Sequence, residues 1–249
     1  MINSEFVKHL SRDEQHVKND HIIELTKILY CKTADNIKNV FSSITTIDSL
    51  DFIDENAKEM VDFITNDRCT IESLSNILEH DYYTHTHSIN VAVYAIFFGQ
   101  ILKLDKEELE YLGISAILHD LGKSKITLDI INKNGKLNEE EFATIKEHPR
   151  LGYEIAKSLG IKNEKVLSGI KHHHERLDGK GYPDNLINDE LKFFPRIIAI
   201  CDVFDALTTK RSYKEPMSTY DAFKLMKEDS LHLDAVLLRK FMQMMVHTK

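Results

Sequence analysis

The scarcity of backbone punctuation is the feature that most constrains how this chain can fold. Its 249 residues contain only 9 glycines and 4 prolines, and apolar residues recur mainly at intervals of three and four. Leu109, Leu112 and Ala116 follow this spacing, which places apolar side chains on one face of a helix. No segment alternates polar and apolar residues for long enough to form a sheet. The sequence therefore predicts an all-α protein built as a helical bundle.

Some helix ends can be located from their capping residues. Asn138 precedes Glu141 by three residues, which is the spacing of a capping box. Pro149 suits the first turn of a helix that Gly160 ends, and Pro195 suits the start of another helix. These signals place three helix starts in the second half of the chain.

Two long segments lack helical periodicity, residues 123–136 and residues 177–190. The second contains Gly179, Gly181 and Pro183, which favour turns. Loops of this length in a compact helical domain are commonly functional. We therefore expect both segments to be irregular and to lie near a site.

The first 70 residues differ in chemistry from the rest of the chain. They form amphipathic segments but hold no cluster of histidines and acids. We therefore divide the chain into an N-terminal helical extension, 1–70, and a main domain, 71–249. A packing element, a homodimer contact and a regulatory element stay open as roles for the extension.

Composition excludes several classes of partner. Lys and Arg total 32 against 40 Asp and Glu, a formal charge of −8, which disfavours polymeric nucleic acid and anionic membrane surfaces. The longest nearly apolar stretch, 91–102, is shorter than the roughly 20 residues that span a bilayer, so we expect no membrane insertion.

The first residues lack the apolar core of a signal peptide. Cys31, Cys69 and Cys201 show no paired spacing and suit reduced thiols. These features together predict a cytoplasmic protein.

Histidine is the residue type that indicates chemistry. Most of the 13 histidines are grouped, and five successive helical segments contain His85 and His87, His119-Asp120, His148, His172 to His174, and Asp202. A helical bundle assembles a metal site from side chains on different helices, so such separation is expected. Imidazole and carboxylate donors suit divalent Zn, Mn, Fe or Ni, and the lack of a cysteine cluster disfavours a structural zinc site. The pattern predicts one convergent metal centre.

Each histidine taken alone has a simpler explanation. His87 could cap a helix or lie on the surface, and His148 could simply close a helix before Pro149. His172, His173 and His174 cannot all face one point, because successive helical residues are about 100° apart. Two neighbours at a helix end can face one point.

Three motifs, which follow one another along the chain, resemble those of a known protein family. They are His119-Asp120 with Lys123, then His173-His174-Glu175-Arg176-x-Asp178-Gly179-x-Gly181-Tyr182-Pro183, then Asp202-Val203-Phe204-Asp205. Over about residues 81–241 the chain resembles the HD-GYP family of bacterial cyclic-dinucleotide phosphodiesterases, within the HD phosphohydrolase superfamily. The resemblance implies a bundle of the HD-domain type in residues 71–249.

The resemblance also implies roles for individual residues. One metal ion would be held by His87, His119, Asp120 and Asp202, and a second by His148, His173, His174 and the shared Asp120. Asp120 and Lys123 would be catalytic. Substrate would meet Lys123, Arg211, Lys214, Gly181 and Tyr182, although Arg211 and Lys214 also fit a solvated turn. Fe or Mn is favoured for the two ions, and the same ligands accept Zn or Ni.

The implied activity is hydrolysis of cyclic di-GMP by a hydroxide held between the ions. The product is linear pGpG, with GMP where hydrolysis continues. Two alternatives stay open: an HD phosphohydrolase acting on another nucleotide such as cyclic GMP-AMP, or a non-catalytic module that senses a dinucleotide or docks proteins through the Gly-Tyr-Pro loop.

Four further residues bear on the site. Some relatives hold a third ion with a glutamate where this chain has Tyr83, and a neutral phenol is a poor ligand, so we expect two ions. Arg176 would fix the loop by pairing with a carboxylate, Glu175 would orient a ligand histidine, and Asp205 would support the ligands or stabilise its helix.

Overall fold

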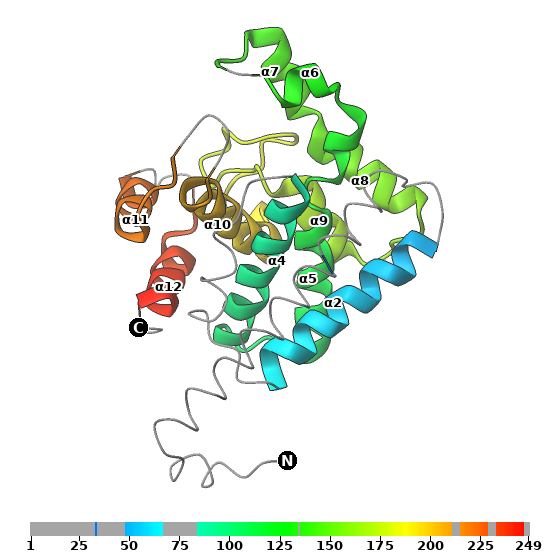
Figure 1. The fold of residues 1–249 in the computed structure, drawn as a ribbon, viewed down its shortest axis with the longest axis vertical. Helices are drawn as coiled ribbons and strands as arrows, with labels where there is room; N and C mark the ends of the chain where they lie inside the picture. The colour runs from blue at the N-terminus through cyan, green and yellow to red at the C-terminus, as the bar shows by residue number, and fades with distance from the viewer. Residues whose placement is uncertain are drawn as a thin grey trace, which may run out of the picture.

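The computed structural model describes residues 33, 48–66, 84–133, 135–210, 215–228 and 233–246. These residues form helices and no strand, apart from an isolated bridge between Asp178 and Ile187. The prediction of an all-α bundle is therefore confirmed. In chain order the elements are α2 (Asp48–Asn66), α4 (Thr84–Ile101), α5 (Lys106–Leu118), the 3-10 helix η2 (Leu121–Lys125), α6 (Leu128–Ile131), α7 (Glu139–Lys146), α8 (His148–Ser158), α9 (Glu164–His172), the 3-10 helix η3 (Asn188–Glu190), α10 (Phe193–Thr208), α11 (Thr219–Glu228) and α12 (Ala235–Val246) (Figure 1).

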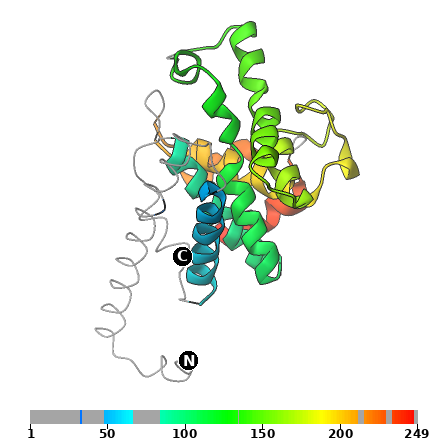
Figure 2. The same ribbon diagram turned by 90° about the vertical axis from the view of Figure 1, so that its right-hand side faces the viewer.

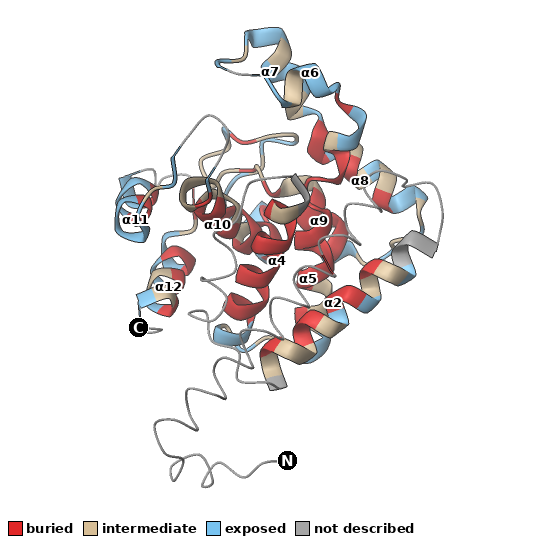
Figure 3. Ribbon diagram, in the orientation of Figure 1, coloured by how far each residue is buried: buried red, intermediate tan, exposed pale blue. Residues whose placement is uncertain are grey.

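Helix α4 lies at the centre of the bundle and contacts α2, α5, α10 and α12. Every residue from His87 to Gly99 is buried, as the red ribbon of α4 shows (Figure 3). A helix that is apolar on all sides needs neighbours on all sides, which explains its central place. Among the described helices, none combines the length and the apolar character needed to cross a membrane.

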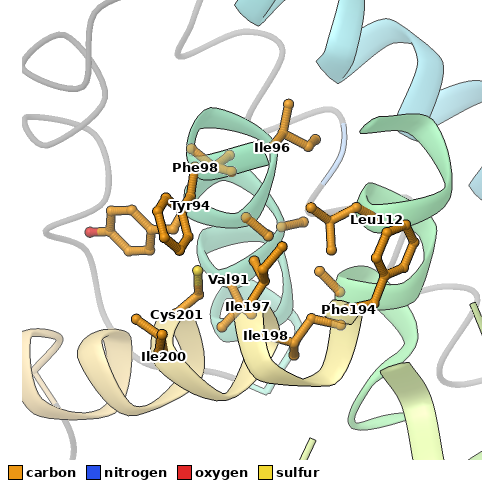
Figure 4. Close-up of a cluster of buried hydrophobic side chains, with 14 of the residues drawn as sticks. Val91, Tyr94, Ile96, Phe98, Leu112, Phe194, Ile197, Ile198, Ile200 and Cys201 are labelled. Carbon is orange, nitrogen blue, oxygen red and sulfur yellow. The ribbon is translucent and has the colours of Figure 1, made fainter. Parts of the chain in front are cut away.

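The core is packed around α4, chiefly against α5 and α10, and Figure 4 shows part of it. Phe98, Phe204 and Phe241 are almost completely buried, and the Phe98 and Phe204 rings each lie 5.3 Å from the Phe241 ring, edge to face. Aromatic rings prefer this arrangement. Cys201 is a free thiol within this core, whereas Cys31 and Cys69 lie outside the described residues.

Helix α2 packs on α5 and α4, and its buried side chains face them at helical spacing. These are Ile53, Ala57, Met60, Val61 and Ile64. The helix belongs to the predicted extension, and residues 67–83, which contain the predicted boundary, lie outside the described residues. The division at residue 70 stays a prediction.

The predicted helix ends agree with the structure. The Asn138 side chain accepts a hydrogen bond from the Glu141 amide at 2.8 Å, and the Glu141 carboxylate accepts one from the Asn138 amide at 2.8 Å. Pro149 stands in the first turn of α8, Gly160 follows that helix, and Pro195 lies in the first turn of α10.

Residues 123–136 were expected to be irregular, and that prediction is partly wrong. They hold the end of η2 and all of α6. A single turn such as α6 is too short for its apolar period to be visible in the sequence. Together α6 and α7 form an excursion that stands away from the bundle and leads into α8 (Figure 2).

Candidate metal centre

Seven predicted side chains reach the centre from different elements. His87 comes from α4, His119 and Asp120 directly follow α5, His148 opens α8, His173 and His174 follow α9, and Asp202 comes from α10. They form two groups in which the donor atoms lie within 4.8 Å of one another. The first group is His87, His119 and Asp202, and the second is Asp120, His148, His173 and His174.

A glycine lets the elements approach closely enough to form the second group. A Cβ atom on Gly122 of η2 would overlap the carbonyl oxygen of His148 and lie 2.5 Å from the amide nitrogen of Gly152. Both are backbone atoms of α8 and cannot move aside. The absence of a side chain at Gly122 therefore allows His148 to come within reach of Asp120.

Asp120 lies between the two groups. Its Oδ2 atom is 3.5 Å from Nε2 of His119 and 3.8 Å from Nε2 of His87. Its Oδ1 atom is 3.2 Å from Nε2 of His148 and 4.0 Å from Nε2 of His173. One carboxylate thus presents one oxygen to each group, which is the arrangement that a residue shared by two ions requires.

Backbone carbonyls fix the protons of three imidazoles. Nδ1 of His119 lies 2.7 Å from the Ala116 oxygen, and Nδ1 of His148 lies 2.7 Å from the Ile145 oxygen. Nδ1 of His173 has the same relation to the Ile170 oxygen, at 2.9 Å. A carbonyl can only accept, so each Nδ1 donates, and the lone pair of each Nε2 points into the centre.

Two observations show that a cation fits among these lone pairs. Nε2 of His119 is buried and makes no hydrogen bond within the described part of the chain, although buried polar atoms are normally paired. Nε2 of His148 and Nε2 of His173 lie 3.2 Å apart with lone pairs toward each other. Two acceptors cannot bond, whereas a metal ion between them would satisfy both.

His87 uses a carboxylate instead of a carbonyl. Its Nδ1 atom lies 2.6 Å from Oδ2 of the fully buried Asp205, and Asp205 also accepts hydrogen bonds from Asn90 and Thr209, each at 2.8 Å. Nε2 of His87 is then directed at Oδ1 of Asp202, 3.0 Å away. Asp205 therefore orients a candidate ligand, and no motif in the sequence points to Asn90 or Thr209 as its partners.

Burial sets the protonation of the ligands. It lowers the pKa of His119, lowers that of His173 well below the ordinary value and lowers that of His174 to about 3. Burial alone would raise the pKa of Asp120, but the Lys123 ammonium and nearby histidines outweigh it and hold that pKa well below its usual range. Neutral imidazoles and an ionised carboxylate at pH 7 are the forms that ligate metals.

Lys123 lies beside the predicted bridging residue. Its Nζ atom is 2.6 Å from Oδ2 of Asp120. Lys123 lies in η2, three residues after Asp120, which caps that helix. The side chain is mostly covered, so the ammonium is a localised positive charge at the centre. The ammonium provides positive charge at the centre, although the chain as a whole carries a net charge of −8.

The Gly-Tyr-Pro loop is held over the second group. The buried Glu175 carboxylate accepts hydrogen bonds from the amides of Asp184 at 2.6 Å and Leu186 at 3.0 Å. A Cβ on Gly181 would overlap the backbone of Glu175 and Arg176, so the loop can pass there only as glycine. The prediction that Glu175 orients a ligand histidine is wrong, because its side chain binds the loop backbone.

The loop places one aromatic ring on the centre. The Tyr182 ring lies 4.9 Å from the His174 ring at 31°, and the Tyr182–Pro183 peptide bond is cis. Burial raises the pKa of Tyr182, so its phenol is neutral. Arg176 pairs with Asp178 at 2.9 Å, one of the partners expected for it.

Four other residues that the sequence analysis discussed lie outside the two groups or outside the described residues. His172 binds Asp184 of the loop at 2.9 Å and does not join either group. Arg211, Lys214 and Tyr83 lie outside the described residues, so the substrate contacts of the first two and the absent third ion stay predictions.

Comparisons with known proteins give the family. The family model described as HD domain matches residues 72–237. The chain is 34% identical over 171 residues to cyclic di-GMP phosphodiesterase PA4108 of Pseudomonas aeruginosa, covering 69% of this chain and 41% of that protein. It is 37% identical over 164 residues to 3'3'-cGAMP-specific phosphodiesterase 2 of Vibrio cholerae, covering 65% of this chain and 31% of that protein. The chain thus spans less than half the length of these relatives.

A solved structure shows the same fold. Bd1817, an HDGYP protein from Bdellovibrio bacteriovorus, superposes with a TM-score of 0.74 at 20% identity, over 88% of this chain and 71% of that chain. The predicted bundle of the HD-domain type is confirmed, and so is the resemblance read from the motifs. Because the family model covers more than half of its length, the chain belongs to the HD domain family.

Proposed function

We propose that the chain is a metal-dependent phosphodiesterase that hydrolyses cyclic di-GMP to linear pGpG, and to GMP where hydrolysis continues. The observation that carries this proposal is the position of Asp120, whose two oxygens face two separate groups of donor atoms. The substrate class is supported by the relatives, several of which are named cyclic di-GMP phosphodiesterases.

We infer two divalent ions. His87, His119 and Asp202 would hold one, His148, His173 and His174 the other, and Asp120 would be shared. Nitrogen and oxygen donors without thiolate suit Mn, Fe, Zn and Ni. Among these we propose Fe or Mn, because the family resemblance favours them.

Such ions, when bound, supply positive charge to the phosphoryl oxygens and make water more acidic. Asp120 contributes an anion that stays ionised, since its pKa lies well below the usual range. The Lys123 ammonium, 2.6 Å from Oδ2 of Asp120, lies within reach of a non-bridging phosphate oxygen beside that carboxylate. Tyr182, a neutral phenol over His174, forms an aromatic wall of the substrate site and excludes water there.

A second substrate is favoured by one observation. The relative named as specific for 3'3'-cGAMP is 37% identical to this chain, a value similar to that of the cyclic di-GMP relatives. Cyclic GMP-AMP is therefore the alternative substrate. Homodimer formation and protein docking through the Gly-Tyr-Pro loop remain predictions.

The test is direct turnover. The chain is loaded anaerobically with Fe²⁺ or Mn²⁺, its metal content is counted, and it is incubated separately with cyclic di-GMP and 3'3'-cGAMP before the products are resolved by chromatography. We expect pGpG from cyclic di-GMP, and no product from the chelated protein. Binding of cyclic di-GMP without turnover by the protein carrying two ions would instead establish the non-catalytic sensor.

A further inference from the structure

A lysine at the edge of the candidate centre lies over two aromatic rings. Nζ of Lys146, the last residue of α7, is 4.7 Å from the centre of the Phe142 ring and 5.6 Å from the centre of the Tyr182 ring. Lys146 is half-buried, whereas Phe142 is 47% exposed. The cation therefore lies between a loop residue and a surface aromatic.

This aromatic-lysine cluster, formed by Phe142, Lys146 and Tyr182, adjoins the donor groups. The centre of the Tyr182 ring lies 4.9 Å from that of the His174 ring, with the planes tilted by 31°, and 6.5 Å from that of the His148 ring. Lys146 precedes His148 by two residues, where the excursion of α6 and α7 joins α8 (Figure 2). A substrate with one phosphate at the centre would extend across this cluster.

Lys146 differs from the other lysines that contact aromatic rings in the described part of the chain. Lys157 also donates to the Tyr153 hydroxyl, Lys165 pairs with Glu108, and Lys171 pairs with Asp184. Lys146 has no ion pair or hydrogen bond to any described residue, although an ammonium carries three donors. Three unused donors on a partly covered cation are available for acceptor atoms of a ligand.

We propose that the cluster is a base subsite in which Lys146 selects guanine over adenine. One edge of guanine carries two acceptors, O6 and N7, whereas the same edge of adenine carries one acceptor and an amino donor. An ammonium can only donate, so it binds the guanine edge and meets an unfavourable donor on adenine. The exposed face of Phe142 offers a surface on which a base can stack, as aromatic side chains do for single-stranded bases.

This inference rests on the proposed function and refines it. It makes the chain a guanine-selective phosphodiesterase, so cyclic di-GMP should be preferred to 3'3'-cGAMP, and 3'3'-cGAMP to cyclic di-AMP. The competing role for Lys146 is contact with the second phosphate of the substrate. A phosphate contact would be equally strong for all three substrates, because they share the same backbone.

The test compares Lys146→Met with the wild-type chain on all three cyclic dinucleotides. Methionine keeps an unbranched stem and removes the donors. We expect the ratio of kcat/KM for cyclic di-GMP over cyclic di-AMP to fall by about 5- to 160-fold, the discrimination typical of a good base contact. Lys157→Met is the matched control, since it removes a lysine that lies over an aromatic ring on another helix, α8, and it should leave the ratio unchanged.

Equal loss on all three substrates, or an unchanged ratio, would overturn the guanine assignment. Phe142→Leu adds a second check, because it should weaken binding of every substrate without changing the ratio. Calorimetric binding of GMP and AMP to the metal-loaded wild type separates the two proposals. The chain could bind GMP more tightly than AMP, lose that preference in Lys146→Met, and still turn over no cyclic dinucleotide. That result would refute the phosphodiesterase function and leave the guanine subsite standing.

Discussion

Replacing Asp205 with asparagine should weaken one metal site while leaving the fold in place. Asparagine has nearly the same side-chain volume as aspartate. Its carbonyl oxygen can still accept hydrogen bonds from Asn90 and Thr209, which in the wild-type chain donate to Asp205 at 2.8 Å. Its amino group would then face Nδ1 of His87, where the carboxylate oxygen lies at 2.6 Å. A donor at that position forces the imidazole proton onto Nε2, and a protonated Nε2 cannot ligate a metal ion.

The magnitude follows from two contributions. The hydrogen bond between an ionised carboxylate and an imidazole contributes about 1.5–3 kcal/mol, so the unfolding free energy of the metal-free protein should fall by up to that amount. Loss of a residue that orients a ligand weakens metal binding by about 10- to 100-fold. At a metal concentration of about 100 Kd, binding stabilises the wild-type site by about 2.7 kcal/mol and the variant site by about 0.4–1.4 kcal/mol.

The assay is urea unfolding with and without Mn²⁺, together with a count of bound Mn per chain. Thr209→Val is the matched control, because it removes one donor to Asp205 but leaves the contact with His87. This control should lose about 1 kcal/mol of stability and keep its metal. An Asp205→Asn protein that unfolds cooperatively and binds Mn²⁺ with wild-type affinity would refute the argument that Asp205 sets the proton of His87.

Three more outcomes can be checked with the same protein. Asp120→Asn should fold and yet yield no detectable product from cyclic di-GMP, and wild-type turnover by the metal-loaded variant would show that Asp120 is not shared. Gly122→Ala should lose about 1–3 kcal/mol of stability in urea, because its Cβ meets the backbone of His148, whereas Gly113→Ala meets only the end of a side chain at 3.1 Å and should lose less. The metal-free protein should become less stable as pH falls below about 6.5, the ordinary histidine pKa. His174 has a folded-state pKa of about 3, so the unfolded chain binds more protons in that window, and urea unfolding that is flat between pH 7 and 5 would contradict this sign.

The sequence predicts the fold and the residues of the two donor groups. It predicts less well the residues that hold those donors in place. Ligand identity is visible because imidazole and carboxylate are rare in a helix core, and His119-Asp120 stands beside Lys123. The need for glycine at Gly122 arises where η2 meets α8, two elements whose approach no local pattern reveals. Glu175 was misread because α9 ends at His172, which turns the glutamate toward the loop backbone instead of a ligand.

Helix ends explain why this bundle can hold several oriented imidazoles. Carbonyls in the last turn of a helix lack the amide four residues on, so they are free to accept from a side chain. His119 uses such a carbonyl at the end of α5, His148 uses one at the end of α7, and His173 uses one at the end of α9. Each histidine thereby satisfies a backbone acceptor and directs its own lone pair inward.

His87 stands in the first turns of α4 and not at the end of a helix. It depends on a carboxylate from another helix, Asp205 of α10, and that carboxylate is itself held by two further donors. Nδ1 of three of these histidines thus lies against a backbone carbonyl, whereas Nδ1 of His87 lies against a carboxylate. Single substitutions can therefore uncouple the site of His87 from the fold, whereas the other three orientations persist for as long as their helices end where they do.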